Sequence, residues 1–328
     1  MADPVLSVRD LVVEFPTRRG TLRALDKVSF DIHEGEVLGM VGESGAGKSI
    51  TGQAIIGLVE PPGRIAGGEI RLKGERIDNL PRRGMRRVRG KRIGMVFQDP
   101  LTSLNPLFTV ADQITETMRT HLEIGEREAR KRAIALLDRV GIPAASRRID
   151  DYPHHFSGGM RQRVVIALAL CAEPELVIAD EPTTALDVSV QAQIIDVLKE
   201  ICAERGASVM LITHDMGVIA ETADRVAVLY AGRMAEIGPV RDLVSAPEHP
   251  YTRGLMGAIP TLTHDSDRLV QIPGAMPRLD NIPQGCAFNP RCPEVFGRCR
   301  AERPELVPRG GGRHVACWLY RRDGGAHG

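Results

Sequence analysis

The sequence predicts an α/β fold: a parallel β-sheet with helices on both faces, preceded by antiparallel strands and followed by a small cysteine-rich domain. Three observations predict it. Short apolar runs typical of buried strands alternate with helix-like segments from about residue 36 to residue 230, which favours parallel strands joined by helices. Residues 5–15 and 24–32 alternate apolar and polar side chains, as antiparallel strands do. After about residue 238, proline and glycine become frequent and the periodicity fades.

Each expected element has its own local signal. Alternation over residues 5–15 and 24–32 predicts two antiparallel strands. Almost uniformly apolar runs predict buried strands at residues 36–41, 92–97, 176–179, 208–213 and 226–230. Helical composition or periodicity predicts helices at residues 48–58, 109–140, 157–171 and 190–205. We therefore expect a main domain over residues 1–238 and an appended domain over residues 239–328.

The composition is that of an ordinary soluble globular protein. Of 328 residues, 43% are hydrophobic and 26% are charged, and the formal net charge is +1. Because the charges nearly balance, no nucleic-acid partner is expected. No apolar run approaches the roughly 18 residues that cross a bilayer. Met1 to Pro4 lack the basic-then-apolar order of a secretion signal, so we expect a cytoplasmic chain that reaches a membrane only through a partner.

Residues 82–92 form a strongly basic stretch. They hold seven Arg and Lys side chains in eleven positions, which fits either a nucleic-acid-binding segment or a solvated loop before the next strand. Surfaces that bind single strands interleave aromatic rings with basic residues. This stretch contains no aromatic residue, so the loop is favoured.

A glycine-rich turn, Gly42 to Ser49, joins the strand predicted at 36–41 to the helix predicted at 48–58. It reads Gly-Glu-Ser-Gly-Ala-Gly-Lys-Ser and matches the P-loop pattern in the setting that this pattern requires. Glycines let backbone N–H groups point at phosphate oxygens, and the helix N-terminus adds partial positive charge. Lys48 would reach the β- and γ-phosphates of ATP, and the Ser49 hydroxyl would bind Mg²⁺. Nucleotide contacts are predicted for Gly42, Ser44, Gly45, Ala46, Gly47, Lys48 and Ser49.

Two adjacent acids, Asp180 and Glu181, follow the apolar run at 176–179. A buried strand that delivers two carboxylates needs partners for them, because unpaired buried charge is costly. Asp180 suits the coordination shell of Mg²⁺. Glu181 points to the opposite side and is suited to polarising an attacking water. Together with the P-loop, this pair predicts a site that binds and hydrolyses Mg-ATP.

Further motifs follow the P-loop. Gln98 ends one predicted strand, residues 157–162 read Ser-Gly-Gly-Met-Arg-Gln, residues 185–187 read Ala-Leu-Asp, and His214 follows another strand. In that order they resemble the Q-loop, signature motif, D-loop and switch histidine of ABC-transporter ATPases. The resemblance implies an ABC-type P-loop ATPase fold with a RecA-like parallel-sheet core, an antiparallel β subdomain and a helical signature subdomain at about residues 99–174.

The signature motif opens a predicted helix and so offers a second phosphate-binding N-terminus. In the family, the signature of one subunit caps the ATP on the other, which implies such a role for Ser157, Gly158 and Gly159. Asp187 of the D-loop is included among the nucleotide-binding residues on the same resemblance. The family usually has Gln where this chain has Met160. Because Ser-Gly-Gly is intact, the cap is expected to survive.

The resemblance also implies roles around the γ-phosphate. Gln98 would contact Mg²⁺ and sense the γ-phosphate. His214 would hydrogen-bond that phosphate and the water at Glu181. For the adenine, the family stacks an aromatic ring from the first antiparallel strands. Phe15 is the nearest candidate, with an ordinary core role as the alternative.

Six cysteines are unevenly distributed. Cys171 and Cys202 lie in apolar, helix-like stretches and are expected to be packed thiols. The other four are spaced C-x5-C-x6-C-x17-C and lack the paired C-x2-C knuckles of a zinc ribbon. In a reducing compartment, four clustered thiolates suggest a soft metal rather than disulfides. These four are Cys286, Cys292, Cys299 and Cys317.

The sequence around the cysteines (285–293), with His-Pro-Tyr-Thr at 249–252, resembles the dipeptide/oligopeptide importer branch, which includes relatives that take up nickel or glutathione. Residues 96–100 and 102–106 match that branch too. In such subunits the four cysteines are taken to hold a [4Fe–4S] cluster. Zinc and unliganded thiols are the alternatives. A structural role is expected, because a Pro- and Gly-rich segment of this size would not hold together easily unaided.

The resemblance implies an ATPase subunit that powers import of di- or oligopeptides from the cytoplasmic face of a bacterial membrane. Its partners would be a second, non-identical ATPase subunit, two transmembrane permease subunits and an extracytoplasmic solute-binding protein. Importers of nickel, glutathione or another small solute are alternatives. A soluble ABC protein acting on DNA or ribosomes is disfavoured, because the sequence has one cassette and no heptad run. Intact Glu181 and His214 count against a subunit that binds ATP without hydrolysing it.

Overall fold

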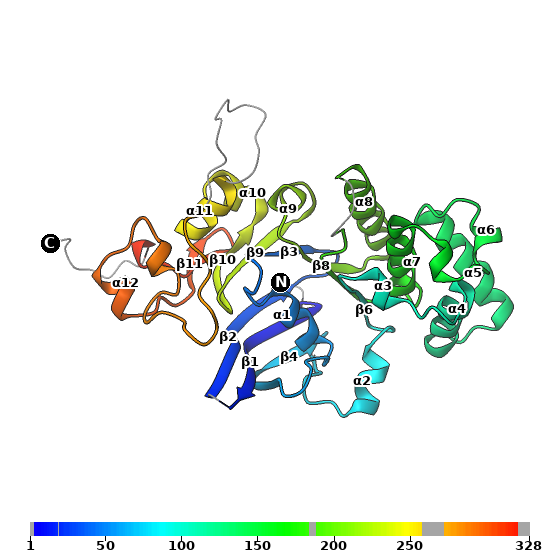
Figure 1. Ribbon diagram of the computed structural model, residues 1–328, viewed down its shortest axis with the longest axis horizontal. Helices are drawn as coiled ribbons and strands as arrows, with labels where there is room; N and C mark the ends of the chain where they lie inside the picture. The colour runs from blue at the N-terminus through cyan, green and yellow to red at the C-terminus, as the bar shows by residue number, and fades with distance from the viewer. Residues whose placement is uncertain (1–2, 19, 184–187, 258–271, 321–328) are drawn as a thin grey trace.

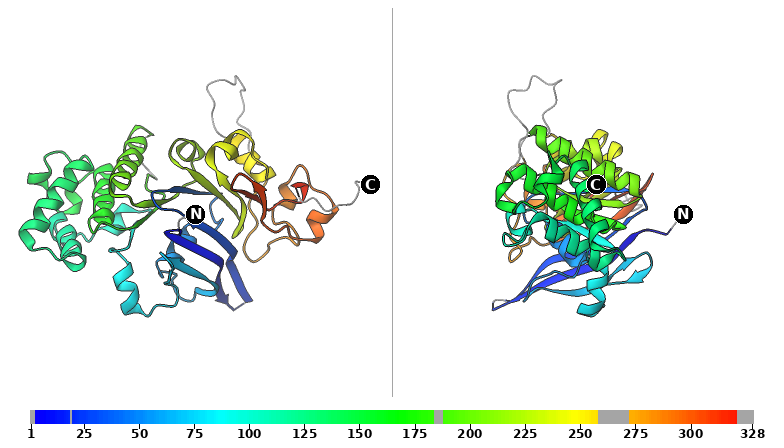
Figure 2. Two further views of the ribbon diagram at one scale, coloured as in Figure 1. Left: turned by 180° about the vertical axis from the view of Figure 1, so that it is seen from behind. Right: turned by 90° about the vertical axis from the view of Figure 1, so that its right-hand side faces the viewer.

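The structure, a computed structural model, describes residues 3–18, 20–183, 188–257 and 272–320. The molecule is elongated, and its helices and strands are arranged from one end of its longest axis to the other (Figure 1). Helices α4 (Val110–His121), α5 (Glu126–Arg139) and α6 (Ala145–Arg148) occupy one end, and α12 (Gly297–Ala301) lies at the other. The view from behind shows the same order, with the sheets between the two ends (Figure 2). Among the described residues, no helix is both long enough and apolar enough to cross a membrane.

Within the described residues, the larger sheet has eight strands in the order β11-β12-β10-β9-β3-β8-β7-β6. Their bounds are β3 Val37–Val41, β6 Ile93–Val96, β7 Leu176–Asp180, β8 Ser208–Ile212, β9 Arg225–Tyr230, β10 Arg233–Pro239, β11 Val307–Gly310 and β12 Arg313–Val315. β9, β3, β8, β7 and β6 run parallel, which confirms the predicted parallel sheet. β10, β12 and β11 continue it with antiparallel pairing that the sequence analysis did not predict.

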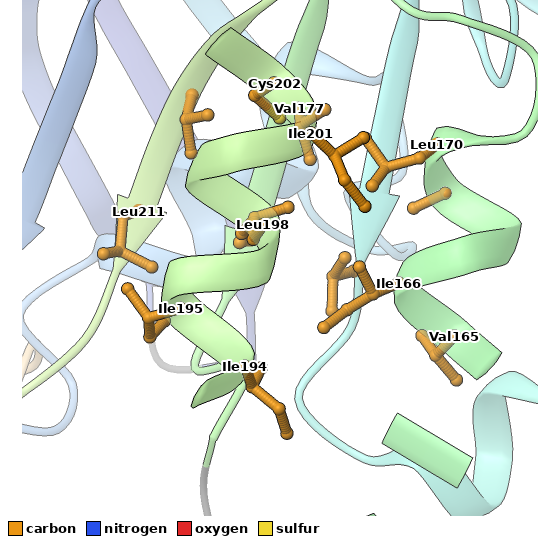
Figure 3. Packing of buried hydrophobic residues seen from close by; sticks show 14 of the residues in the cluster. Val165, Ile166, Leu170, Val177, Ile194, Ile195, Leu198, Ile201, Cys202 and Leu211 are labelled. Carbon is orange, nitrogen blue, oxygen red and sulfur yellow. The ribbon is translucent and has the colours of Figure 1, made fainter. Parts of the chain in front are cut away.

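Helices cover both faces of the larger sheet, which is why its central strands are apolar throughout. Val177 of β7 belongs to a core with α7, α8 and α9, whereas the next residue, Ile178, belongs to a core with α1 and the smaller sheet. Figure 3 shows Ile194 and Leu198 of α8 beside Ile166 of α7 in the first of these cores. The bounds are α1 Lys48–Ile55, α7 Gly158–Leu170, α8 Val188–Arg205 and α9 Met216–Thr222.

The smaller sheet is antiparallel, with the order β2-β1-β4-β5 in the described part of the chain. Its strands are β1 Leu6–Thr17, β2 Gly20–Ile32, β4 Arg64–Leu72 and β5 Glu75–Arg76. β1 and β2 confirm the two antiparallel strands predicted near the N-terminus. β4 and β5 were not predicted; in β4, Gly67 and Gly68 interrupt the apolar–polar alternation that would have indicated a strand.

The basic stretch at 82–92 is not simply a solvated loop, so that prediction is wrong. Its first part forms helix α2 (Arg82–Val88), which buries Met85 and Val88. Arg89 donates from Nε to the carbonyl oxygen of Ile56 over 2.7 Å. The stretch thus attaches the end of α1 to the following strand through its apolar and arginine side chains.

The helix predicted at 109–140 is two helices, α4 and α5, separated by a break at Leu122–Gly125. Thr109 caps α4 through a capping box in which its hydroxyl accepts from the N–H of Asp112 and the Asp112 carboxylate accepts from the N–H of Thr109. Shorter helices in this part are α3 Pro100–Ser103, α6 and the 3₁₀ turn η1 Pro153–His155.

The C-terminal residues continue the main sheet. β12 pairs with β10 in a register that sets Glu236 opposite Val315. The division into domains at residues 238/239 stays a prediction. The boundary falls inside β10, and β10 is hydrogen-bonded to β12 from the C-terminal side of it. The remaining elements are α10 Val240–Ser245, α11 Pro250–Gly257, η2 Asn289–Arg291, α12 and η3 Trp318–Tyr320.

Candidate active site

The P-loop, residues 42–49, connects the end of β3 to α1 and includes the first two residues of that helix, in the setting that was predicted. Two of its glycines are required by space as well as by backbone angle. Gly42 has φ 151°, and a Cβ there would lie 2.3 Å from the carbonyl oxygen of Leu229. Gly47 has φ 108°, and a Cβ there would lie 2.6 Å from Leu25 Cδ2. The loop can therefore fold tightly enough to surround a phosphate only with glycine at these positions.

Lys48 is the first residue of α1 and is only 5% exposed. Its Nζ donates to the carbonyl oxygens of Gly42 over 2.8 Å and Glu43 over 3.2 Å. Burial lowers the pKa of Lys48, although the nearby carboxylates Glu181 and Asp180 oppose this. A buried ammonium held inside the P-loop lacks the solvation it would have in water, and phosphate oxygens are the ligand that compensates for this.

Ser49 and Asp180 meet across the site. The Ser49 hydroxyl donates to Asp180 Oδ1 over 2.9 Å, which joins α1 to the end of β7. Burial raises the pKa of Asp180, opposed by the hydrogen bond from Ser49, and the adjacent Glu181 raises it further. The ionised carboxylate is therefore costly until a cation pairs with it. A hydroxyl and a carboxylate oxygen side by side form the hard-oxygen donor set that suits Mg²⁺.

Glu181 follows β7 directly and has a left-handed backbone, φ 45°. Its two carboxylate oxygens face two different predicted residues. Gln98 Nε2 donates to Oε2 over 2.9 Å, and His214 Nδ1 lies 3.4 Å from Oε1. Gln98 comes from the end of β6 and His214 from the end of β8, so three neighbouring parallel strands deliver these groups to one edge of the sheet.

The signature residues form the cap that the sequence predicts. Ser157 is the N-cap of α7, and its hydroxyl accepts from the N–H of Met160 over 3.3 Å. The unusual Met160 therefore leaves the cap in place. Ser157 and Gly158 are exposed, on a helix packed with the helical part of the molecule rather than at the P-loop. Asp187, with the rest of the Ala-Leu-Asp motif, lies outside the described residues.

The structure places Phe15, the predicted adenine contact, on β1. The Phe15 ring lies against Gly63, where a Cβ would be 2.5 Å from Phe15 Cε1. Leu22, which faces Phe15 across the β1–β2 pair, lines a groove together with Ser44, Gly45 and the C-terminal segment 275–280. Phe15 as the stacking residue stays a prediction.

The four C-terminal cysteines line one common pocket with Phe288 and Trp318. Burial raises the pKa of Cys286 to about 11 and that of Cys317 to about 12. Among the described residues, however, no group of three or more His, Cys, Asp or Glu side chains is arranged to hold a metal ion. The [4Fe–4S] cluster therefore stays a prediction.

Cys171 and Cys202 are buried, as predicted, and each is 2% exposed. Burial raises the pKa of both thiols to about 12. They behave as packed apolar side chains.

Two residues that the sequence analysis did not connect to the site contact the P-loop. The Tyr251 hydroxyl accepts from the N–H of Glu43 over 2.9 Å, and Arg291 Nη1 pairs with Glu43 Oε2 over 2.9 Å. Both lie more than 200 positions from Glu43 in the chain. No periodicity or spacing signals so distant a contact; the His-Pro-Tyr-Thr run at 249–252 indicated only the branch of the family.

Comparisons with known proteins agree with this geometry. Residues 25–184 match the ABC transporter family, and residues 235–299 match the oligopeptide/dipeptide transporter C-terminal region. The dipeptide transport ATP-binding protein DppD of Bacillus subtilis (strain 168) is 48% identical over 318 residues, 97% of this chain and 95% of its own. The protein of the same name from Escherichia coli (strain K12) is 44% identical over 98% of both chains.

A solved structure of the ATP-binding cassette MJ0796, a dimeric post-hydrolysis state bound to ADP and Pi, superimposes with a TM-score of 0.66 at 28% identity. It covers 72% of this chain and 99% of its own. These similarities confirm the predicted ABC ATPase fold. The chain belongs to the ABC transporter family, as an ATP-binding and ATP-hydrolysing subunit of the branch with the oligopeptide/dipeptide C-terminal region.

Proposed function

We propose that this chain powers the import of di- or oligopeptides from the cytoplasmic face of a bacterial membrane. The observation that carries the proposal is similarity over nearly the whole chain, C-terminal region included, to transport proteins named for dipeptides. Importers of nickel, glutathione or another small solute are the second candidate, because the substrate of an importer is selected by subunits other than the ATPase.

The residues of the site are suited to separate roles in ATP hydrolysis. The P-loop N–H groups and Lys48 bind the phosphates, while Ser49 and Asp180, with Gln98, would hold Mg²⁺. An Mg²⁺ ion held there would supply charge neutralisation at the phosphate oxygens. Glu181 orients the attacking water and accepts its proton. His214 Nδ1 lies 3.4 Å from the same carboxylate, and the imidazole ring is available to the γ-phosphate.

The site is also suited to completion by a second ATPase subunit. His214 is 66% exposed, and at the N-terminus of α7 Ser157 and Gly158 are exposed while Gly159 is half-buried. We infer that this N-terminus caps ATP on the partner and that the partner caps ATP on this chain. The partner is a similar, non-identical subunit. Two permease subunits and a solute-binding protein complete the transporter.

An uptake assay tests the substrate class. Cells that carry the intact chain are compared with cells that carry Lys48→Ala, using radiolabelled dipeptide, nickel and glutathione in parallel. We expect dipeptide uptake to fall to background in the variant, with nickel and glutathione uptake unchanged. Loss of nickel or glutathione uptake with dipeptide uptake intact would overturn the peptide assignment in favour of that solute.

We further propose that Cys286, Cys292, Cys299 and Cys317 hold a [4Fe–4S] cluster with a structural role. The support is that all four line one pocket. The backbone also ties two of them together, since the N–H of Cys286 donates to the carbonyl oxygen of Cys299 over 2.8 Å. Four thiols are the donor set of such clusters, which would crosslink three separate segments of the C-terminal region.

Iron and acid-labile sulfide analysis of anaerobically purified protein tests the cluster. We expect about four of each per chain, with broad absorption near roughly 400 nm. Cys286→Ser should lose both, whereas Cys202→Ser, which alters a buried thiol in the sheet core, should retain both. Stoichiometric zinc without sulfide, or no metal at all, would contradict the cluster.

A further inference from the structure

The first variable residue of the P-loop, Glu43, is held by the C-terminal part of the chain. Its N–H donates to the Tyr251 hydroxyl over 2.9 Å, and its carboxylate pairs with Arg291 over 2.9 Å. Its carbonyl oxygen in turn accepts from Lys48 Nζ over 3.2 Å and from the N–H of Ala46 over 3.1 Å. Glu43 therefore connects two C-terminal side chains to the lysine and the backbone of the phosphate-binding loop.

Arg291 is fixed from several sides. Its side chain is only 7% exposed. Besides Glu43, it donates to the Tyr230 hydroxyl over 3.3 Å and to the carbonyl oxygen of Pro273 over 2.8 Å. Its guanidinium lies 5.9 Å from the ring centres of both Tyr230 and Phe288. A guanidinium with this many partners has little freedom to leave Glu43.

Tyr251 is equally constrained. It is fully buried on α11, with its ring edge-on to Tyr230 at 4.7 Å between centres. Burial raises the pKa of Tyr251, so its hydroxyl stays protonated and neutral. The hydroxyl meets the N–H of Glu43 in a buried setting, where leaving either group without a hydrogen-bond partner would be costly.

Arg291 also contacts the segment that begins at residue 272, which lies beside the P-loop. It donates from Nη2 to the carbonyl oxygen of Gly274 over 3.3 Å. Two residues later, Met276 Cε lies 3.0 Å from where a Cβ on Gly45 would be. The side chain of Met276 thus lies beside the P-loop at Gly45.

We propose that Tyr251 and Arg291 are positioning residues for ATP binding. A loop with glycine at 42, 45 and 47 loses much conformational entropy when it orders around phosphate. Holding Glu43 orders the loop, and with it Lys48 and Ala46, before ATP arrives, which removes that cost from binding. Glu181, Gln98 and His214 make none of the contacts described for Tyr251 and Arg291. The brace should therefore act on ATP affinity far more than on the rate of the chemical step.

Equilibrium titration of the full-length chain with a fluorescent ATP analogue tests this, together with steady-state hydrolysis by the assembled transporter. For Arg291→Ala and for Tyr251→Phe we expect Kd and KM for ATP to rise by about tenfold, with kcat within about twofold of the parent. Arg309→Ala is the matched control. Arg309 also pairs with a glutamate, Glu248, and lies over a ring, Tyr320, but makes no described contact with the P-loop.

A mutant cycle with Glu43→Ala separates positioning from general stability. If Arg291 acts through Glu43, the double variant Glu43→Ala with Arg291→Ala should bind ATP no more weakly than whichever of the two single variants has the lower affinity. Additive losses, or an affinity equal to the parent in both Tyr251→Phe and Arg291→Lys, would overturn the proposal. So would kcat and the melting temperature falling together while KM stays constant. A parent chain that bound no nucleotide would instead count against the ATP site itself.

Discussion

ATP turnover by the assembled transporter is expected to fall by about a hundredfold or more when Glu181 is replaced by glutamine, because a positioned general base contributes about that much. The amide oxygen can still accept the hydrogen bond that Gln98 Nε2 now donates to Oε2 over 2.9 Å. The change therefore removes the proton acceptor and leaves the geometry in place. ATP binding should persist, so the closed pair of ATPase subunits should be longer-lived.

Phosphate release measures the turnover, and nucleotide retained through gel filtration measures the trapped state. Glu221→Gln is the matched control, since Glu221 is an exposed carboxylate on α9, away from the end of β7. Its turnover should equal that of the parent. Unchanged turnover in Glu181→Gln would rule out Glu181 as the general base.

Replacing Lys48 by alanine is expected to weaken ATP binding by about a hundredfold, since charge-assisted hydrogen bonds to phosphate are among the strongest in proteins. The loss has two parts: the ammonium itself, and the two bonds that hold the carbonyls of Gly42 and Glu43. Titration with a fluorescent ATP analogue measures the combined loss of affinity.

The melting temperature distinguishes this loss from misfolding. Burial lowers the pKa of Lys48, so the positive charge of this side chain costs the folded state stability rather than contributing to it. Its removal should leave the nucleotide-free melting temperature near that of the parent, while the rise in melting temperature on adding ATP should disappear. Lys199→Ala, which changes an exposed lysine on α8, should keep that rise. An ATP-induced rise retained in Lys48→Ala would contradict the assigned role.

The parallel core could be predicted because its signals are local. Val177 and Ile178 are adjacent apolar residues that face different cores, and a strand buried on both faces reads as a continuous apolar run. Glu181, Gln98 and His214 each follow such a run. Because parallel strands end at one edge of a sheet, their meeting was implied once the strands were recognised.

The remaining features depend on contacts that the sequence does not signal. The break between α4 and α5 falls at a glycine, Gly125, inside an otherwise helical pattern, and such a glycine can be tolerated in a helix or end it. β12 is three residues long and is defined by its partner β10 rather than by its own composition. Tyr251 and Arg291 reach Glu43 only because the C-terminal segment folds back over the sheet.

The pairing of β12 with β10 also bears on the solubility of the protein. Without β12, β10 would present an unpaired row of N–H and C=O groups at the end of the sheet, a template on which another copy could add a strand. Without the residues that follow β10, Glu236 on this strand would lose three donors: the N–H groups of Glu248 and His249, and the guanidinium of Arg313. The C-terminal residues therefore shield the cassette from edge-to-edge self-association, whatever else they bind.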